Sequence, residues 1–125
     1  SSVCPLTMAK LSHTLKLIKK KTTDTPLQVM MISIDSKHDT PEILGRFLNQ
    51  FDPHFIGAVG AQQDVKSFAH SLGIAFDENT NASSREAFIH SGTLVLVNPN
   101  AELVAYFTPP IHSKKLAHDL LIFVS

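Results

Sequence analysis

The chain lacks several features that would point to a function directly. It has one cysteine in 125 residues, which permits no internal disulfide. No apolar run approaches the roughly 18 residues that a membrane-spanning helix needs. Eleven basic and eleven acidic residues give a net charge of zero with His neutral. Because nucleic acid and anionic membranes attract basic surfaces, neither is expected as the main partner. With no secretory signal and no initiator methionine, the chain is expected to be processed or truncated.

What the chain does contain is an alternation of helical and strand-like segments. An apolar content of 43% in this length fits one domain over residues 1–125. Hydrophobic spacing and capping signals predict helices at Pro5–Lys21, from Pro41 to about Asn49, at Gln62–Leu72 and at Ser113–Val124. Short apolar runs predict strands at Leu27–Ile34, Phe55–Val59, Gly92–Val97 and Glu102–Phe107, with Asp77–Glu86 as a polar loop. This order predicts an α/β fold with a layered sheet.

Cys4 stands directly before Pro5, where the first helix is expected to begin. A helix N-terminus carries partial positive charge and backbone N–H groups without intrahelical partners. This setting favours the thiolate, which attacks disulfides and binds soft metals. The alternative is an inert cysteine buried as a small hydrophobe. The residues by themselves leave both interpretations open.

Asp35 ends the first predicted strand at its C-terminal edge, where open α/β sheets place their sites. It either orients a ligand or bound water, or it forms the turn that follows the strand. Met30 and Met31 are expected to pack in the core rather than to bind metal. Asp39 and Glu42 are interpreted as charges at the start of the second helix, with no functional role.

Six of the seven histidines are expected to be solvated surface or loop residues. They are His13, His38, His54, His70, His112 and His118. His90 carries no special local signal and would by itself be interpreted as a histidine at the edge of a strand.

Several segments in order resemble the Sco/SenC family of copper chaperones, which serve cytochrome c oxidase assembly on a thioredoxin-like fold. They are Val3-Cys4-Pro5, Ile32–Pro41 (ISIDSKHDTP), Phe51–Gly57 (FDPHFIG), His90-Ser91, the turn Asn98-Pro99-Asn100 and Leu103–Phe107 (LVAYF). The resemblance implies a thioredoxin-like mixed sheet flanked by helices.

In that family, a Cys-x-x-x-Cys-Pro motif and a distant histidine bind copper. Cys4 matches the second cysteine and His90 matches the distant histidine. The first cysteine would fall immediately before Ser1, and the strand that carries it in the family is also missing. The resemblance therefore implies an N-terminally truncated domain whose copper, as Cu(I) or Cu(II), is held by Cys4, His90 and an upstream thiolate.

The resemblance allows two functions. The first is a metallochaperone that delivers copper to the oxidase subunit carrying the copper site. The second is a thiol–disulfide oxidoreductase that reduces the cysteines of that site. A non-catalytic thioredoxin-like interaction domain is a third interpretation. Other copper chaperones or thioredoxin-like reductants are expected as further partners. The implied location is the periplasmic side of the inner membrane or the mitochondrial intermembrane space, with a tether outside this chain.

Overall fold

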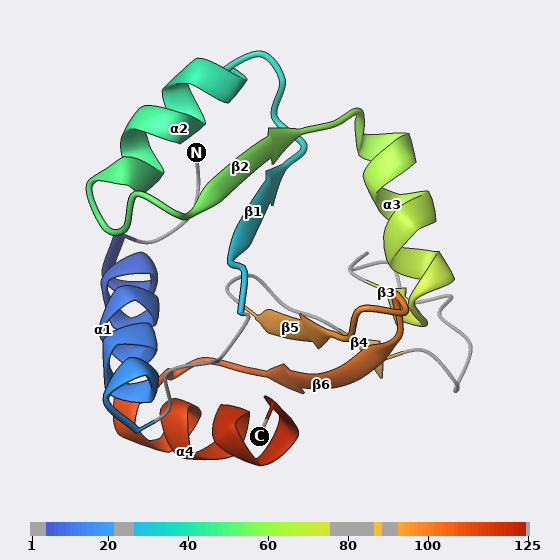
Figure 1. Ribbon diagram of the computed structural model, residues 1–125. Helices are drawn as coiled ribbons and strands as arrows, with labels where there is room; N and C mark the ends of the chain where they lie inside the picture. Colours follow the sequence, from blue (N-terminus) through green and yellow to red (C-terminus); the bar gives the residue numbers. More distant parts are fainter. Residues whose placement is uncertain (1–4, 22–26, 76–86, 89–92, 125) are drawn as a thin grey trace.

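The computed structural model describes residues 5–21, 27–75, 87–88 and 93–124 (Figure 1). The elements in chain order are α1 (Pro5–Lys21), β1 (Met30–Ser33), α2 (Pro41–Asn49), β2 (Ile56–Val59), α3 (Gln62–Ser71), β3 (Ile74–Ala75), β4 (Ala87–Phe88), β5 (Leu94–Val97), β6 (Leu103–Phe107) and α4 (Ser113–Val124). Within these ranges, no helix combines the length and the apolar content that crossing a membrane requires.

The predicted helices and the four predicted strands are confirmed in place. α1, α2 and α4 have the expected bounds, and α3 ends one residue early, before Gly73 at φ 76°. The first strand is shorter than its apolar run, because only Met30–Ser33 pairs with a neighbour. The short strands β3 and β4 were not predicted, since two-residue segments carry no readable periodicity.

The described strands form three two-stranded sheets. β1 and β2 pair in parallel, with Met30 opposite Ile56 and Ser33 opposite Val59. The pair β3–β4 is also parallel, whereas β5 and β6 form an antiparallel hairpin. The side chain of Asn98 closes this hairpin by accepting hydrogen bonds from the backbone N–H groups of Asn100 and Glu102. Parallel and antiparallel pairs thus occur together, as the predicted mixed α/β class requires.

The hydrophobic core lies between the helices and one face of the β1–β2 pair. Leu44 and Leu48 of α2 are fully buried and lie against Gly57 of β2. The other buried members of this core are Met8, Leu11, Ile18, Met31, Phe55, Ile111, Leu116, Ala117 and Leu120. The members in α1 (Met8, Leu11 and Ile18) and in α4 (Leu116, Ala117 and Leu120) lie along one face of each helix, as in an amphipathic helix.

Helix α1 is held in place along its length. It packs beside α4, with which it shares the core (Figure 1). The Ser12 hydroxyl donates to the Phe51 carbonyl at 2.7 Å, and the Ser113 hydroxyl donates to the Lys10 carbonyl at 3.2 Å. The middle of α1 is therefore fixed to the rest of the fold.

Strand β1 buries only one of its two faces. Met31 and Ser33 are buried, whereas Met30, Ile32 and Ile34 are exposed. The prediction of core packing is confirmed for Met31 and wrong for Met30, which is 53% exposed. The physical reason is the two-residue period of a strand, which sends neighbouring side chains to opposite faces.

Candidate functional site

The predicted thiol position precedes a regular helix. α1 begins at Pro5, has no acidic residue in its first turn and carries Lys19, Lys20 and Lys21 in its last turn. The missing N–H of proline costs nothing at a first helical position. With no carboxylate in the first turn, nothing in that turn offsets the positive end of the helix dipole. The described part of α1 therefore has the electrostatic character that a thiolate directly before it would need.

Cys4 and His90, the two predicted copper ligands, lie outside the described residues. Cys4 is one position before α1, and His90 falls in the segment between β4 and β5. The meeting of the two side chains therefore stays a prediction. Among the residues that the structure describes, no three His, Cys, Asp or Glu side chains gather closely enough to hold a metal ion.

A buried polar pair marks the end of β1. Ser33, the last residue of the strand, donates its hydroxyl proton to Asp39 Oδ2 at 2.5 Å. Asp39 is 2% exposed and Ser33 is 7% exposed. The hydrogen bond from Ser33 favours the ionised carboxylate, which lowers the pKa of Asp39 below its ordinary value of 3.8. A buried carboxylate thus lies at the carboxyl edge of the sheet, beside the start of α2.

Asp35 organises the loop between β1 and α2. Its carbonyl accepts from the backbone N–H groups of His38 and Asp39, at 3.2 and 2.8 Å. Nδ1 of His38 lies 3.0 Å from both Asp35 carboxylate oxygens. Asp35 therefore forms a turn, as one of its two interpretations expected. Its second predicted role, orienting a ligand or a bound water, stays a prediction.

Asp39 is the site residue that sequence reasoning missed. The interpretation of Asp39 as a charge at the start of a helix with no functional role does not account for its burial. The Oγ1 atom of Thr40 caps α2 by accepting from the Ile43 N–H, so Asp39 precedes the cap and turns inward toward Ser33. The sequence offered no signal for this burial, because the alternation of Ser33 with the apolar Ile32 and Ile34 would by itself place Ser33 on the outer face.

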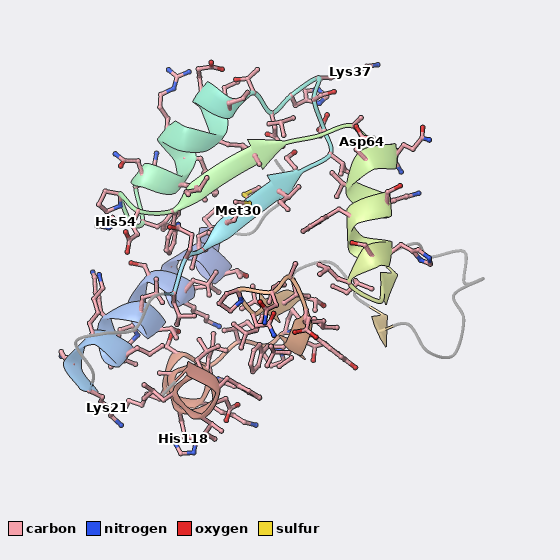
Figure 2. The ribbon with its side chains drawn as sticks, turned by 45° about the vertical axis from the view of Figure 1, so that its right-hand side comes forward. Lys21, Met30, Lys37, His54, Asp64 and His118 are labelled. Atoms are coloured by element: carbon pink, nitrogen blue, oxygen red, sulfur yellow. The ribbon has the colours of Figure 1, made fainter. Side chains whose placement is uncertain are left out.

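The other histidines lie on the surface, as predicted. His13, His38, His54, His70, His112 and His118 are all exposed. His54 lies at the end of the sheet where β2 begins, opposite the end marked by Lys37 after β1 (Figure 2). His118 lies on α4, away from both ends of β1 (Figure 2).

Comparison with known proteins identifies the family of this chain. The family model described as SCO1/SenC matches residues 1–125, which is the whole chain. The chain belongs to the SCO1/SenC family. The resemblance inferred from the ordered segments is thereby confirmed.

Its curated relatives are distant and longer. A putative copper-binding protein of Stutzerimonas stutzeri is 28% identical over 109 residues, covering 87% of this chain and 53% of that protein. The mitochondrial SCO1 homolog of Homo sapiens is 26% identical over 106 residues, covering 84% of this chain and 35% of that protein. The chain spans about half the length, or less, of these relatives.

Solved structures share the fold. Yeast Sco1 superposes with a TM-score of 0.75 at 24% identity, covering 99% of this chain and 76% of that one. Arabidopsis thaliana ScoI with copper bound superposes with a TM-score of 0.74 at 22% identity, covering 98% and 75%. The predicted thioredoxin-like class is confirmed by these matches.

Proposed function

We propose that this protein binds copper through Cys4 and His90, together with a cysteine thiolate immediately before Ser1. The bound copper ion is then delivered to the cytochrome c oxidase subunit that carries the copper site. The observation that carries this proposal is the SCO1/SenC family match over the whole chain. Support also comes from a relative named as copper-binding and from the copper-bound Sco proteins of yeast and Arabidopsis.

The proposed ligands, two cysteine thiolates and one imidazole, are chemically suited to copper. Thiolates are soft ligands that select Cu(I), and imidazole binds copper in either oxidation state. The start of α1 would stabilise the Cys4 thiolate through the helix dipole and its unpaired N–H groups. Two thiolates and one imidazole make a trigonal site, whereas Cys4 and His90 would leave it incomplete. The same three groups can release the ion by exchange with thiolates of an acceptor.

The decisive experiment measures copper binding in the protein extended to include the residues that precede Ser1. Cys4→Ser and His90→Ala should each weaken Cu(I) affinity at least about tenfold, the equivalent of 1.4 kcal/mol. His54→Ala is the matched control, because His54 is exposed beside the start of β2 and should not change affinity. Full affinity in both ligand variants would contradict the proposed site.

The second candidate function, thiol–disulfide exchange, rests on the same cysteine before α1. His90→Ala separates the two, because a copper site needs the imidazole as a ligand whereas a thiolate pair retains exchange at a reduced rate. Loss of copper binding with retained reduction of a peptide disulfide would favour the oxidoreductase. If the extended protein showed neither copper binding nor disulfide reduction, the non-catalytic interaction domain would be the remaining interpretation.

Asp35 is proposed to orient a ligand or a bound water at the carboxyl edge of the sheet. Asp35→Asn would then lower copper affinity without changing the number of ions bound.

The proposed location is the periplasmic face of the inner membrane or the mitochondrial intermembrane space. Support comes from relatives named as mitochondrial in Homo sapiens and as a lipoprotein in Bacillus anthracis.

A further inference from the structure

Basic residues are unevenly distributed over the fold. The net charge of zero, which by itself argues against an anionic membrane as the main partner, is an average over the chain. Helices α1 and α4 together contain seven of the eleven Lys and Arg residues but one of the eleven acidic residues, Asp119. The seven are Lys10, Lys16, Lys19, Lys20, Lys21, Lys114 and Lys115. The zero net charge therefore conceals a local excess of positive charge on these two helices.

Most of these lysines are available to a partner. The exposed basic side chains of α1 and α4, called here the basic face, are Lys16, Lys19, Lys20, Lys21, Lys114, Lys115 and His118. Lys16 and Lys20 stand four residues apart and so form one row on α1, as Lys114 and His118 do on α4. Within the described part of the chain, no ion pair joins any of these lysines to a carboxylate.

The helix dipoles explain only part of this arrangement. Lys19, Lys20 and Lys21 lie in the last turn of α1, where positive charge stabilises the helix. Lys114 and Lys115 lie in the first turn of α4, which contains no acidic residue and where positive charge is unfavourable. The lysines at the start of α4 therefore do not serve the stability of their own helix.

The basic face lies on the side of the molecule opposite the carboxyl edge of the sheet. α1 and α4 pack together and direct their buried sides to the shared core. Figure 2 shows Lys21 and His118 on the same lower side, whereas Lys37, after β1, lies on the upper side. The 17 residues of α1 span about 25 Å, so Lys21 is far from Pro5 at the start of this helix.

An exposed apolar residue continues the row of basic residues on α4. Ile122 is 66% exposed and follows His118 by four residues, and the next residue, Phe123, is 48% exposed. A helical surface that combines lysines with protruding apolar side chains suits the interface of a lipid bilayer, where apolar groups insert between acyl chains while lysines contact phosphates. A partner held by charge alone would need only the lysines.

We propose that the basic face, together with Ile122, binds the surface of an anionic lipid bilayer. The lysines contact lipid phosphates, and Ile122 inserts at the boundary between headgroups and acyl chains. In this orientation the carboxyl edge of the sheet points away from the bilayer, toward a partner in solution or one that projects from the membrane. The proposal goes beyond copper binding and does not depend on it.

Co-sedimentation with vesicles tests the proposal, with the upstream-extended protein prepared without any membrane tether. It should bind vesicles of phosphatidylglycerol and phosphatidylcholine but not vesicles of phosphatidylcholine alone, and binding should weaken as salt is raised. The double variant Lys16→Gln, Lys20→Gln should bind at least about tenfold more weakly, since each lysine near an anionic surface strengthens binding about fivefold. Ile122→Ser should also weaken binding.

The matched control is the double variant Lys37→Gln, Arg46→Gln, which removes two exposed charges outside the basic face and should bind like the natural protein. Melting temperatures of all variants establish that they remain folded. No binding to the anionic vesicles, or equal losses in the two double variants, would overturn the proposal. Equal affinity for soluble poly-glutamate, with no effect of Ile122→Ser, would assign the surface to an acidic protein instead. None of these measurements involves copper, so their failure leaves the proposed function standing.

Discussion

At the scale of single residues, the buried pair of Ser33 and Asp39 is the feature with the clearest energetic consequence. A carboxylate that is 2% exposed is stable in the folded protein only while hydrogen bonds favour its ionised form. Ser33 supplies such a bond at 2.5 Å. Since the folded-state pKa of Asp39 lies below 3.8, the carboxylate stabilises the fold above that pH and loses this contribution as the pH falls further.

Ser33→Ala should therefore lower stability at neutral pH and raise the folded-state pKa of Asp39 toward its ordinary value. The difference in unfolding free energy between the variant and the natural protein should shrink as the pH falls below 3.8 and through the lowered folded-state pKa of Asp39, because protonation removes the charge that Ser33 stabilises. Urea denaturation at pH 7, 4 and 3 measures this difference. Ser36→Ala, on the exposed loop that follows, is the control and should unfold like the natural protein. A constant difference at all three pH values would mean that Ser33 does not act through the charge on Asp39.

At the scale of elements, close packing of α2 on β2 depends on the absence of a side chain at Gly57. A Cβ atom there would lie 2.8 Å from Leu44 Cβ and 3.1 Å from Leu48 Cδ1, both fully buried. The helix would have to move away from the strand, since contacts below 3.0 Å are not tolerated. Gly57 therefore sets the distance between these two layers.

Gly57→Ala should destabilise the protein by about 1–3 kcal/mol, the usual cost of overpacking a core. Gly45→Ala is the matched variant, because Gly45 lies in α2 with open space around its Cα atom. It should stabilise the protein by about 0.5–1 kcal/mol through helix propensity. Thermal unfolding of both variants gives the comparison. Equal shifts of the same sign would refute the assigned packing.

Helix bounds were predictable because their signals are local. Thr40 and Pro41 at the start of α2, and Gly73 after α3, act through the backbone groups next to them. The lengths of the strands were not predictable, because they depend on how many residues pair with a neighbouring strand. The apolar run Leu27–Ile34 extends beyond β1, but only four of its residues have a neighbour in β2.

At the scale of the whole molecule, the described strands form three separate pairs, which predicts that residues 1–125 are less stable than a longer protein. Extension upstream by about 40 residues should raise the melting temperature, because an added central strand would bond to the open edge of β1 and add apolar side chains to the core. Each kcal/mol gained corresponds to about 4 °C in a protein of this size. Differential scanning calorimetry of both proteins makes the measurement. Equal melting temperatures would count against a missing strand in the core.

The sequence by itself determined the order of the four helices and of the strands β1, β2, β5 and β6, the family and the two candidate copper ligands. These follow from local signals and from the order of matching segments along the chain, which need no knowledge of distance. Only the tertiary structure decided that Met30 faces outward, that Asp39 is buried against Ser33 and that one edge of β1 is open among the described strands. Each of these depends on which residues far apart in the chain come to lie together, and a one-dimensional pattern does not contain that information.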